Sequence, residues 1–83
     1  MNWTENKDGL NSELQFTDQT ELAEFVLKLA QLSDKKEHHA DLDIRYNKLS
    51  LRLISHDVNE ITDRDRKMAA IIEQLAAENG LKG

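Results

Sequence analysis

The spacing of the apolar residues changes along this chain, and that change constrains the fold more than any other feature. Residues 10–16 and 42–53 carry apolar side chains mainly at alternate positions, whereas residues 18–36 and 62–79 carry them at helical spacing. Alternation is typical of a strand with one buried face, and helical spacing is typical of an amphipathic helix. Because 83 residues suffice for only one small domain, these segments have to share a single core.

A hairpin is expected at the amino end. Lys7-Asp8-Gly9 is typical of a turn, because Gly9 tolerates backbone conformations that other residues avoid. Trp3 precedes this turn, and residues 10–16 follow it as a strand with Ser12 as the polar exception on its apolar face.

The first helix is expected from Asp18 to about Ser33–Lys36. Asp18 can accept a hydrogen bond at the helix start, and Glu21 three residues later completes a pair resembling a capping box. Beyond this helix, residues 41–46 and 48–53 alternate apolar with charged or polar side chains, which predicts two half-buried strands. Because the turn signal around residues 46–48 is weak, one long bent strand is the alternative. The side chains expected on their buried face are Leu42, Ile44, Tyr46, Leu49, Leu51 and Leu53.

The second helix is expected between Thr62 and Asn79-Gly80. Thr62 can cap its start with Asp65 as the reciprocal partner, Asn79-Gly80 is typical of a helix end, and residues 81–83 are expected to fray. The order is therefore β-β-α-β-β-α. It predicts an α+β fold, with a four-stranded antiparallel sheet and both helices packed on one face.

Composition excludes several classes of protein. The absence of cysteine excludes disulfides, thiolate metal sites and a cysteine nucleophile. A net charge of −5, from 11 Lys+Arg and 16 Asp+Glu, disfavours non-specific binding to nucleic acid. No apolar run approaches the roughly 18 residues that span a bilayer, and the amino end lacks the features of a signal peptide. We expect a soluble cytoplasmic protein with a single domain over residues 1–83.

The three histidines are the first candidates for chemistry. His38 and His39 follow the first helix, and His56 follows the last expected strand, so the three can converge on one rim of the sheet. Histidine titrates near neutral pH, and converging imidazoles can therefore transfer protons. Two alternatives stay open: a surface pair that suits the helix macrodipole, and a zinc or nickel site. Adjacent histidines on a strand point to opposite faces, which makes a shared metal awkward.

Other polar residues carry less specific signals. Asp65 is a capping residue that can also face a ligand, because the start of its helix lies next to the loop of His56. Asp34 is otherwise a solvated carboxylate at a helix end, and Tyr46 is otherwise an aromatic of the core or the sheet edge.

Taken together, these residues resemble the pterin-4a-carbinolamine dehydratase family. The matching positions are Asp34, His38-His39, Tyr46, His56 and Asp65, at the spacing that the family shows. Ala40 departs from the pattern, because the family has Pro, Cys or Ser there. The similarity covers about residues 3–76.

The resemblance implies a dehydratase that converts 4a-hydroxytetrahydropterins to quinonoid dihydropterins, in tetrahydropterin recycling. It implies acid–base roles for His38 and His56, a carboxylate at the site from Asp65, and support of His38 by Asp34. The substrate-binding residues that it implies are His39, Asp34 and Tyr46. No metal, redox cofactor, membrane or direct nucleic-acid partner is implied.

The same resemblance leaves a binding role open. Some family members are dimerisation cofactors of homeodomain transcription factors, and a related lineage assists Rubisco assembly in carboxysomes. Family members are dimers or tetramers, so a homodimer or homotetramer is expected, with an exposed edge strand as a natural contact.

Overall fold

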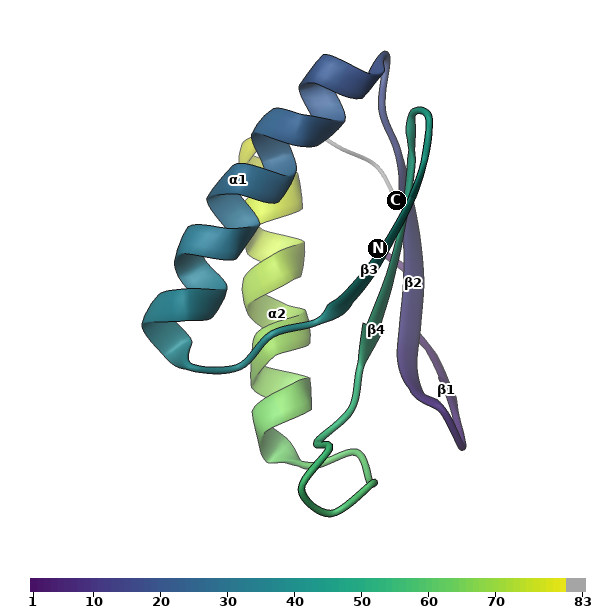
Figure 1. Cartoon of the computed structure of the whole chain (residues 1–83), viewed down its shortest axis with the longest axis vertical. Coiled ribbons are helices and arrows are strands. Elements are labelled where there is room, and N and C mark those ends of the chain that lie inside the picture. Colours follow the sequence, from purple (N-terminus) through teal and green to yellow (C-terminus); the bar gives the residue numbers. More distant parts are fainter. Residues whose placement is uncertain (81–83) are drawn as a thin grey trace.

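The computed structural model describes residues 1–80 and confirms the predicted order of elements. The elements are β1 Thr4–Asn6, β2 Gly9–Gln15, α1 Gln19–Lys36, β3 Asp41–Arg45, β4 Lys48–Leu53 and α2 Asp63–Glu78. The strands form one antiparallel sheet in the order β1-β2-β4-β3, and both helices lie on the same face of it (Figure 1). The predicted α+β fold is therefore confirmed, while the predicted frayed tail at 81–83 lies outside the described residues.

The core lies between the helices and the two central strands, β2 and β4. Ser12, the polar exception on β2, is half-buried and donates a hydrogen bond to the Asn2 carbonyl oxygen at 2.7 Å, which satisfies its hydroxyl. The buried apolar side chains are Leu10, Leu14, Phe16, Leu22, Phe25, Leu29, Leu49, Leu51, Leu53, Met68, Ala69, Ile72, Leu75 and Ala76. No helix within residues 1–80 is long and apolar enough to cross a membrane.

The end of α1 sets the direction of the chain that carries two of the histidines. Asp18 caps the start of α1 as predicted, accepting from the Glu21 N–H at 2.9 Å. At the other end Glu37 adopts a left-handed conformation with φ 56°, and the His38 N–H donates to the Ser33 carbonyl oxygen at 3.2 Å. The chain therefore turns back under the helix towards β3.

The expectation that β3 is half-buried was wrong. Leu42 and Ile44 are 39% and 44% exposed, and Tyr46 is 66% exposed. Leu42 pairs with Leu51 and Ile44 with Leu49, so these side chains do share the helix-facing side of the sheet. However, β3 is an edge strand of the sheet, and the helices cover the central strands instead. Alternation identifies the apolar side of a strand but does not show whether anything covers it.

Gly9 allows the β1–β2 turn to lie close to the end of β4. Its φ is 123°, and a Cβ at this position would lie 2.3 Å from the Leu53 carbonyl oxygen. Only glycine accommodates both the backbone conformation and the contact. The turn therefore lies beside the stretch that leads from β4 into the loop of His56.

Candidate active site

His38 forms a buried pair with Asp65 at the start of α2. The His38 Nε2 atom lies 2.6 Å from Asp65 Oδ1, with 14% of the histidine side chain and none of the aspartate side chain exposed. An ionised carboxylate can only accept hydrogen bonds, so Nε2 carries the proton and Nδ1 is the ring nitrogen left for other chemistry. The pair joins the α1–β3 connection to α2, two segments that are far apart in the sequence.

The second oxygen of Asp65 is held by the end of β4 and the start of α2. Its Oδ2 atom accepts from the Thr62 N–H at 2.8 Å and from the Ser55 hydroxyl at 2.9 Å. The first contact is the predicted reciprocal bond of the capping box. Burial acts to raise the pKa of Asp65, but the hydrogen bonds from Thr62, His38 and Ser55 outweigh it, so this pKa lies below its usual range. Asp65 is thus a buried carboxylate that stays ionised at neutral pH.

Asp34 supports His39 and not His38, contrary to expectation. The Asp34 Oδ1 atom lies 2.7 Å from His39 Nε2, and both side chains are largely exposed. The left-handed turn at Glu37 leads the chain away from α1, and there the two neighbouring histidine side chains face opposite sides, one nearly buried and one exposed. His38 therefore points inward to Asp65, and His39 points outward to the end of α1.

His56 lies at the same end of the molecule, beside an acidic residue that the sequence did not indicate. Its Nε2 atom is 3.6 Å from Asp41 Oδ2, and Arg52 donates to that same oxygen from Nε at 3.0 Å and from its terminal nitrogen at 2.8 Å. The His56 side chain is 63% exposed. It borders an open hollow of about 280 Å³, lined also by Lys7, Asp8, Arg52, Ile54 and Asn59.

Hydrogen bonds within the loop and an ion pair with α2 hold the short loop that carries His56. The Ser55 N–H donates to the Glu60 carbonyl oxygen at 3.0 Å, and the Val58 N–H donates to the Ser55 carbonyl oxygen at 3.1 Å. Arg64 of α2 donates to Asp57 at 2.6 Å and holds the pKa of Asp57 below its usual range. An exposed histidine is thereby carried on backbone that is fixed to α2.

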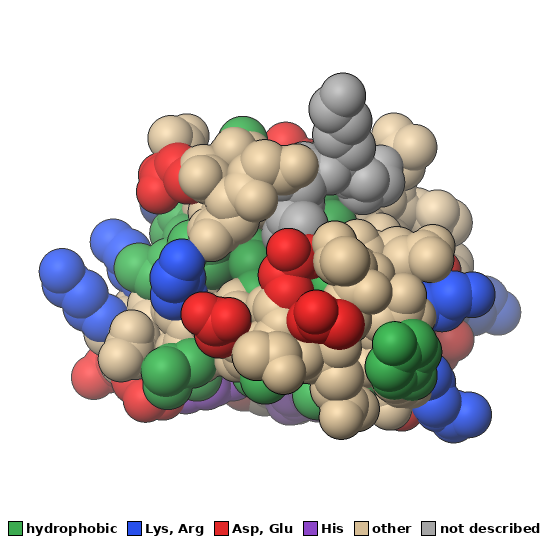
Figure 2. Space-filling model, turned by 90° about the horizontal axis from the view of Figure 1, so that it is seen from above, with side chains coloured by type: hydrophobic (Ala, Val, Ile, Leu, Met, Phe, Trp, Pro, Cys, Tyr) green, Lys and Arg blue, Asp and Glu red, His purple; other side chains and the backbone are tan. Residues whose placement is uncertain are grey.

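The histidines gather at one end of the fold, and Tyr46 does not join them. In Figure 1 the α1–β3 connection and the loop after β4 lie at the lower end of the molecule. Viewed from the opposite end, histidine shows only as a narrow band at one margin (Figure 2). Tyr46 lies in the turn between β3 and β4, with φ 51°. It stands beyond the far end of β3, so the whole length of that strand, about 17 Å at about 3.3 Å per residue, separates it from the α1–β3 connection.

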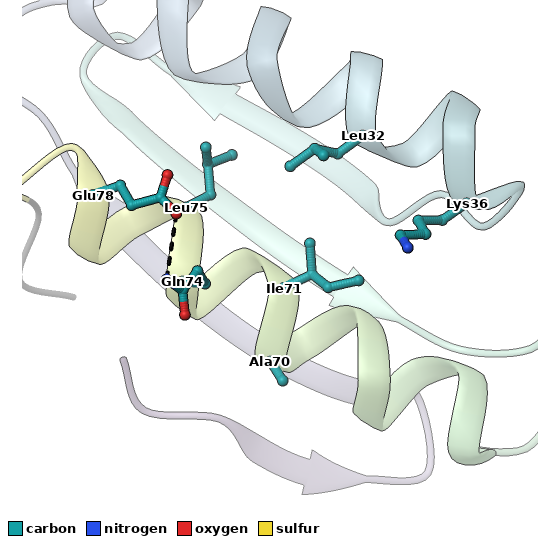
Figure 3. A pocket seen from close by; sticks show the side chains of 7 residues that line it. All are labelled: Leu32, Lys36, Ala70, Ile71, Gln74, Leu75 and Glu78. Carbon is teal, nitrogen blue, oxygen red and sulfur yellow. Dashed lines mark hydrogen bonds between the residues drawn. The ribbon is translucent and has the colours of Figure 1, made fainter.

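A second hollow, between the helices, lacks the chemistry of the first. It has a volume of about 430 Å³ and lies between the carboxyl-terminal parts of α1 and α2. Its lining is formed by Leu32, Lys36, Ala70, Ile71, Gln74, Leu75 and Glu78 (Figure 3). Among residues 1–80 no group of three or more His, Asp or Glu side chains is arranged to hold a metal ion. The histidine end, where three imidazoles each face a carboxylate, is the candidate site for proton transfer.

Sequence reasoning missed Ser55 and Asp41. Ser55 follows the last core residue of β4 and directly precedes His56, so its position between a strand and a candidate histidine was an available signal. Asp41 looked like an ordinary outward-facing strand residue. Its partners, Arg52 on β4 and His56 beyond it, become neighbours only through the strand pairing of Asp41 with Arg52.

Comparison with known proteins points to one family. The family described as pterin 4 alpha carbinolamine dehydratase matches residues 1–75. A protein of Acidobacterium capsulatum, provisionally named as a pterin-4-alpha-carbinolamine dehydratase, is 37% identical over 73 residues, covering 88% of this chain and 79% of its own. A similarly named protein of Thermomicrobium roseum is 35% identical over 75 residues, covering 90% of this chain and 81% of its own.

Solved structures agree with this fold. A Brucella melitensis protein described as a transcriptional coactivator/pterin dehydratase superposes with a TM-score of 0.83 at 25% identity, over 89% of this chain and 81% of its own. A pterin dehydratase-like protein identified as a RuBisCO assembly factor in the alpha-carboxysome gives a TM-score of 0.72 at 18% identity, over 90% of this chain and 87% of its own. The second similarity concerns the fold alone.

Proposed function

Since the chain belongs to the pterin-4a-carbinolamine dehydratase family, we propose that it catalyses the dehydration of a 4a-hydroxytetrahydropterin to a quinonoid dihydropterin. The observation that carries the proposal is the buried His38–Asp65 pair, which lies at the same end of the fold as His56. The reaction would serve tetrahydropterin recycling in the cytoplasm.

The chemistry requires two proton transfers. The bond between C4a and the hydroxyl oxygen breaks, and the neighbouring ring nitrogen forms a double bond to C4a. One proton joins the departing hydroxide to give water, and one proton leaves the ring nitrogen. Two positioned groups, one protonated and one unprotonated, can perform both transfers without net proton uptake.

His38 is suited to accept the ring-nitrogen proton. Its Nε2–H is directed to Asp65, so Nδ1 has the lone pair that a general base needs. When Nδ1 takes the proton, the imidazolium lies 2.6 Å from the Asp65 carboxylate, which stabilises the new charge. Asp65 is fully buried behind His38, so its role in this scheme is to position and stabilise that histidine.

His56 is suited to donate the proton to the departing hydroxide. It is exposed towards the open hollow, and its Nε2 lies 3.6 Å from Asp41 Oδ2, so the carboxylate can orient the ring. Arg52 holds Asp41 in place. His39, oriented by Asp34 at the protein surface, is proposed to bind and orient the pterin.

The direct test is turnover of a synthetic 4a-hydroxytetrahydropterin by purified protein. We expect acceleration without added metal and an unchanged rate in the presence of a chelator, because the scheme uses only side-chain protons. Activity that is lost with chelator and restored by zinc would contradict the acid–base scheme.

A binding role is the second candidate. The two structural relatives above are described as a coactivator/dehydratase and as a RuBisCO assembly factor, and this chain exposes Leu42 and Ile44 on its edge strand. Folded protein that gives no turnover in the assay would favour this role over the dehydratase.

A further inference from the structure

We propose that Ser55 is a positioning residue of the active site, whose hydroxyl fixes Asp65 and thereby orients His38, while its backbone holds the loop of His56. This inference rests on the proposed dehydratase function. Ser55 itself is buried, with a relative exposure of 1%, so it acts through these neighbours and does not touch substrate.

The side chain of Ser55 stands in the middle of a short chain of hydrogen bonds. Its Oγ atom lies 2.7 Å from the Thr62 hydroxyl and 2.9 Å from Asp65 Oδ2. The carboxylate can only accept, so Ser55 donates to Asp65 and can accept from the Thr62 hydroxyl, which also lies 3.5 Å from Asp65 Oδ2. Such a chain strengthens the bond to the carboxylate, because each hydroxyl polarises the next. Ser55 therefore restricts the position of the oxygen opposite the one that holds His38.

The backbone of Ser55 fixes the second histidine. Both its N–H and its carbonyl group bond within the loop, to Glu60 and Val58 respectively. His56 is the next residue, so these two bonds fix the position of its backbone. One residue thus supports both proposed acid–base groups: its side chain holds the carboxylate that pairs with His38, and its main chain holds the loop of His56.

The charges around Asp65 are few, which makes its titration a sensitive measure of this network. From the α1–β3 connection, His38 is the titratable group in contact with it. From α2, Asp63 is exposed, and Arg64 and Arg66 are exposed and bound to Asp57 and Glu5. From the end of β4, the contact is the neutral hydroxyl of Ser55. A change at Ser55 therefore acts on Asp65 by losing one hydrogen bond.

The experiment compares Ser55→Ala with Ser55→Thr and Ser33→Ala. Ser33 is equally buried, at 3% exposure, but its side chain takes no part in the Asp65 network, so it controls for the loss of a buried hydroxyl. We expect Ser55→Ala to lower kcat about tenfold, as the loss of one charge-assisted hydrogen bond implies, with KM within about twofold. Ser55→Thr keeps the hydroxyl and is expected to recover most of kcat, and Ser33→Ala to leave it unchanged.

A second readout does not depend on activity. The 13C resonance of the Asp65 carboxyl group, followed against pH, is expected to titrate at higher pH in Ser55→Ala than in the wild type and in Ser33→Ala, because a bond that lowers the pKa of Asp65 is gone.

The outcomes separate this inference from the proposed function. A wild-type protein without dehydratase activity contradicts the function, while a shifted Asp65 titration in Ser55→Ala still supports control of Asp65 by Ser55. An active wild type, together with a Ser55→Ala variant of unchanged kcat and unchanged Asp65 titration, overturns the inference. The same holds if Ser33→Ala lowers kcat as much as Ser55→Ala, because the effect is then one of general stability.

Discussion

Each histidine has a carboxylate partner, but the three pairs differ in how far they are buried. His38 is nearly enclosed and faces the buried Asp65, whereas His39 and His56 are paired with exposed Asp34 and Asp41. An exposed pair is weakened by water and salt, while a buried pair with satisfied hydrogen bonds fixes both partners in one geometry. The histidine expected to be most rigid is therefore His38.

Substitution of the histidines should separate chemistry from binding. We expect His38→Ala and His56→Ala each to lower kcat by about 10²–10⁴-fold, the usual effect of a positioned proton-transfer group. His39→Ala should act mainly on KM, because it is assigned to binding. Steady-state kinetics, with circular dichroism to verify folding, measures this. Near-wild-type turnover in both the His38 and His56 variants would refute the assignment.

The ionised state of Asp65 should make stability depend on pH at the acidic end. Its folded-state pKa is lowered, so its contribution is fully present above its unfolded value of about 3.9 and is lost as pH falls through the folded value. We expect Asp65→Asn to unfold at lower urea concentration at pH 7 and to lose less further stability on acidification. The matched control is Asp63→Asn, an exposed carboxylate of the same helical turn. If the urea midpoints of the wild type and Asp65→Asn fall by the same amount on acidification, this expectation is contradicted.

At the scale of the element, the close approach of the β1–β2 turn to β4 depends on Gly9. Gly9→Ala combines a positive φ with a Cβ only 2.3 Å from the Leu53 carbonyl oxygen, so the backbone has to move. Gly80→Ala is the matched control, because Gly80 also has a positive φ, 72°, but no atom within 4 Å of the added Cβ. Left-handed backbone alone costs about 1–2 kcal/mol, so we expect Gly80→Ala to lose about that much and Gly9→Ala clearly more. Urea unfolding measures the free energy of unfolding of both variants. Equal decreases would show that the backbone avoids the contact with the Leu53 carbonyl oxygen without loss of stability.

Helices and strands could be predicted from the sequence, whereas the exposure of β3 and several side-chain partners could not. The helices were predictable because apolar periodicity and the capping residues Asp18 and Thr62 agree with one another. The exposure of β3 was not, because alternation contains no information on which strand lies at an edge of the sheet. The family resemblance assigned Asp34 to the support of His38, but after the left-handed turn at Glu37 it is His39 that lies against Asp34. The position of Ser55 before His56 was a signal in the sequence, but its bond to Asp65 depends on how the loop folds back to α2. The contacts of Asp41 depend on the pairing of β3 with β4, which alternation alone does not reveal.

At the scale of the whole molecule, two apolar surfaces remain uncovered within the described residues. One is the helix-facing side of β3 with Leu42 and Ile44, and the other is the hollow between α1 and α2 that includes Ile71. An edge strand also presents unpaired backbone groups, which a second copy can satisfy by extending the sheet. We therefore expect a dimer or tetramer at micromolar concentration, measured by sedimentation velocity. A well-folded monomer would show that neither surface is an interface between copies.

The charges of β3 make its contribution to such an assembly testable. If two copies of β3 pair antiparallel about a two-fold axis at Asp43, then Asp41 of one copy faces Arg45 of the other, and Leu42 faces Ile44. Arg45→Glu places two negative charges opposite each other and should shift the protein towards the monomer. Lys67→Glu, the same charge change at an exposed position on α2, is the control and should leave the assembly intact.

Substitutions on α2 test the second surface in the same experiment. Ile71→Gln alters the half-buried hollow and should weaken assembly without unfolding the chain, whereas Ile72→Gln introduces a polar group at a fully buried position and should unfold it. Circular dichroism distinguishes the two results. If Arg45→Glu and Ile71→Gln both sediment like the wild type, neither surface holds the copies together. If only Arg45→Glu dissociates the protein, the sheet edge is the interface and the hollow between the helices stays open to solvent or to another partner.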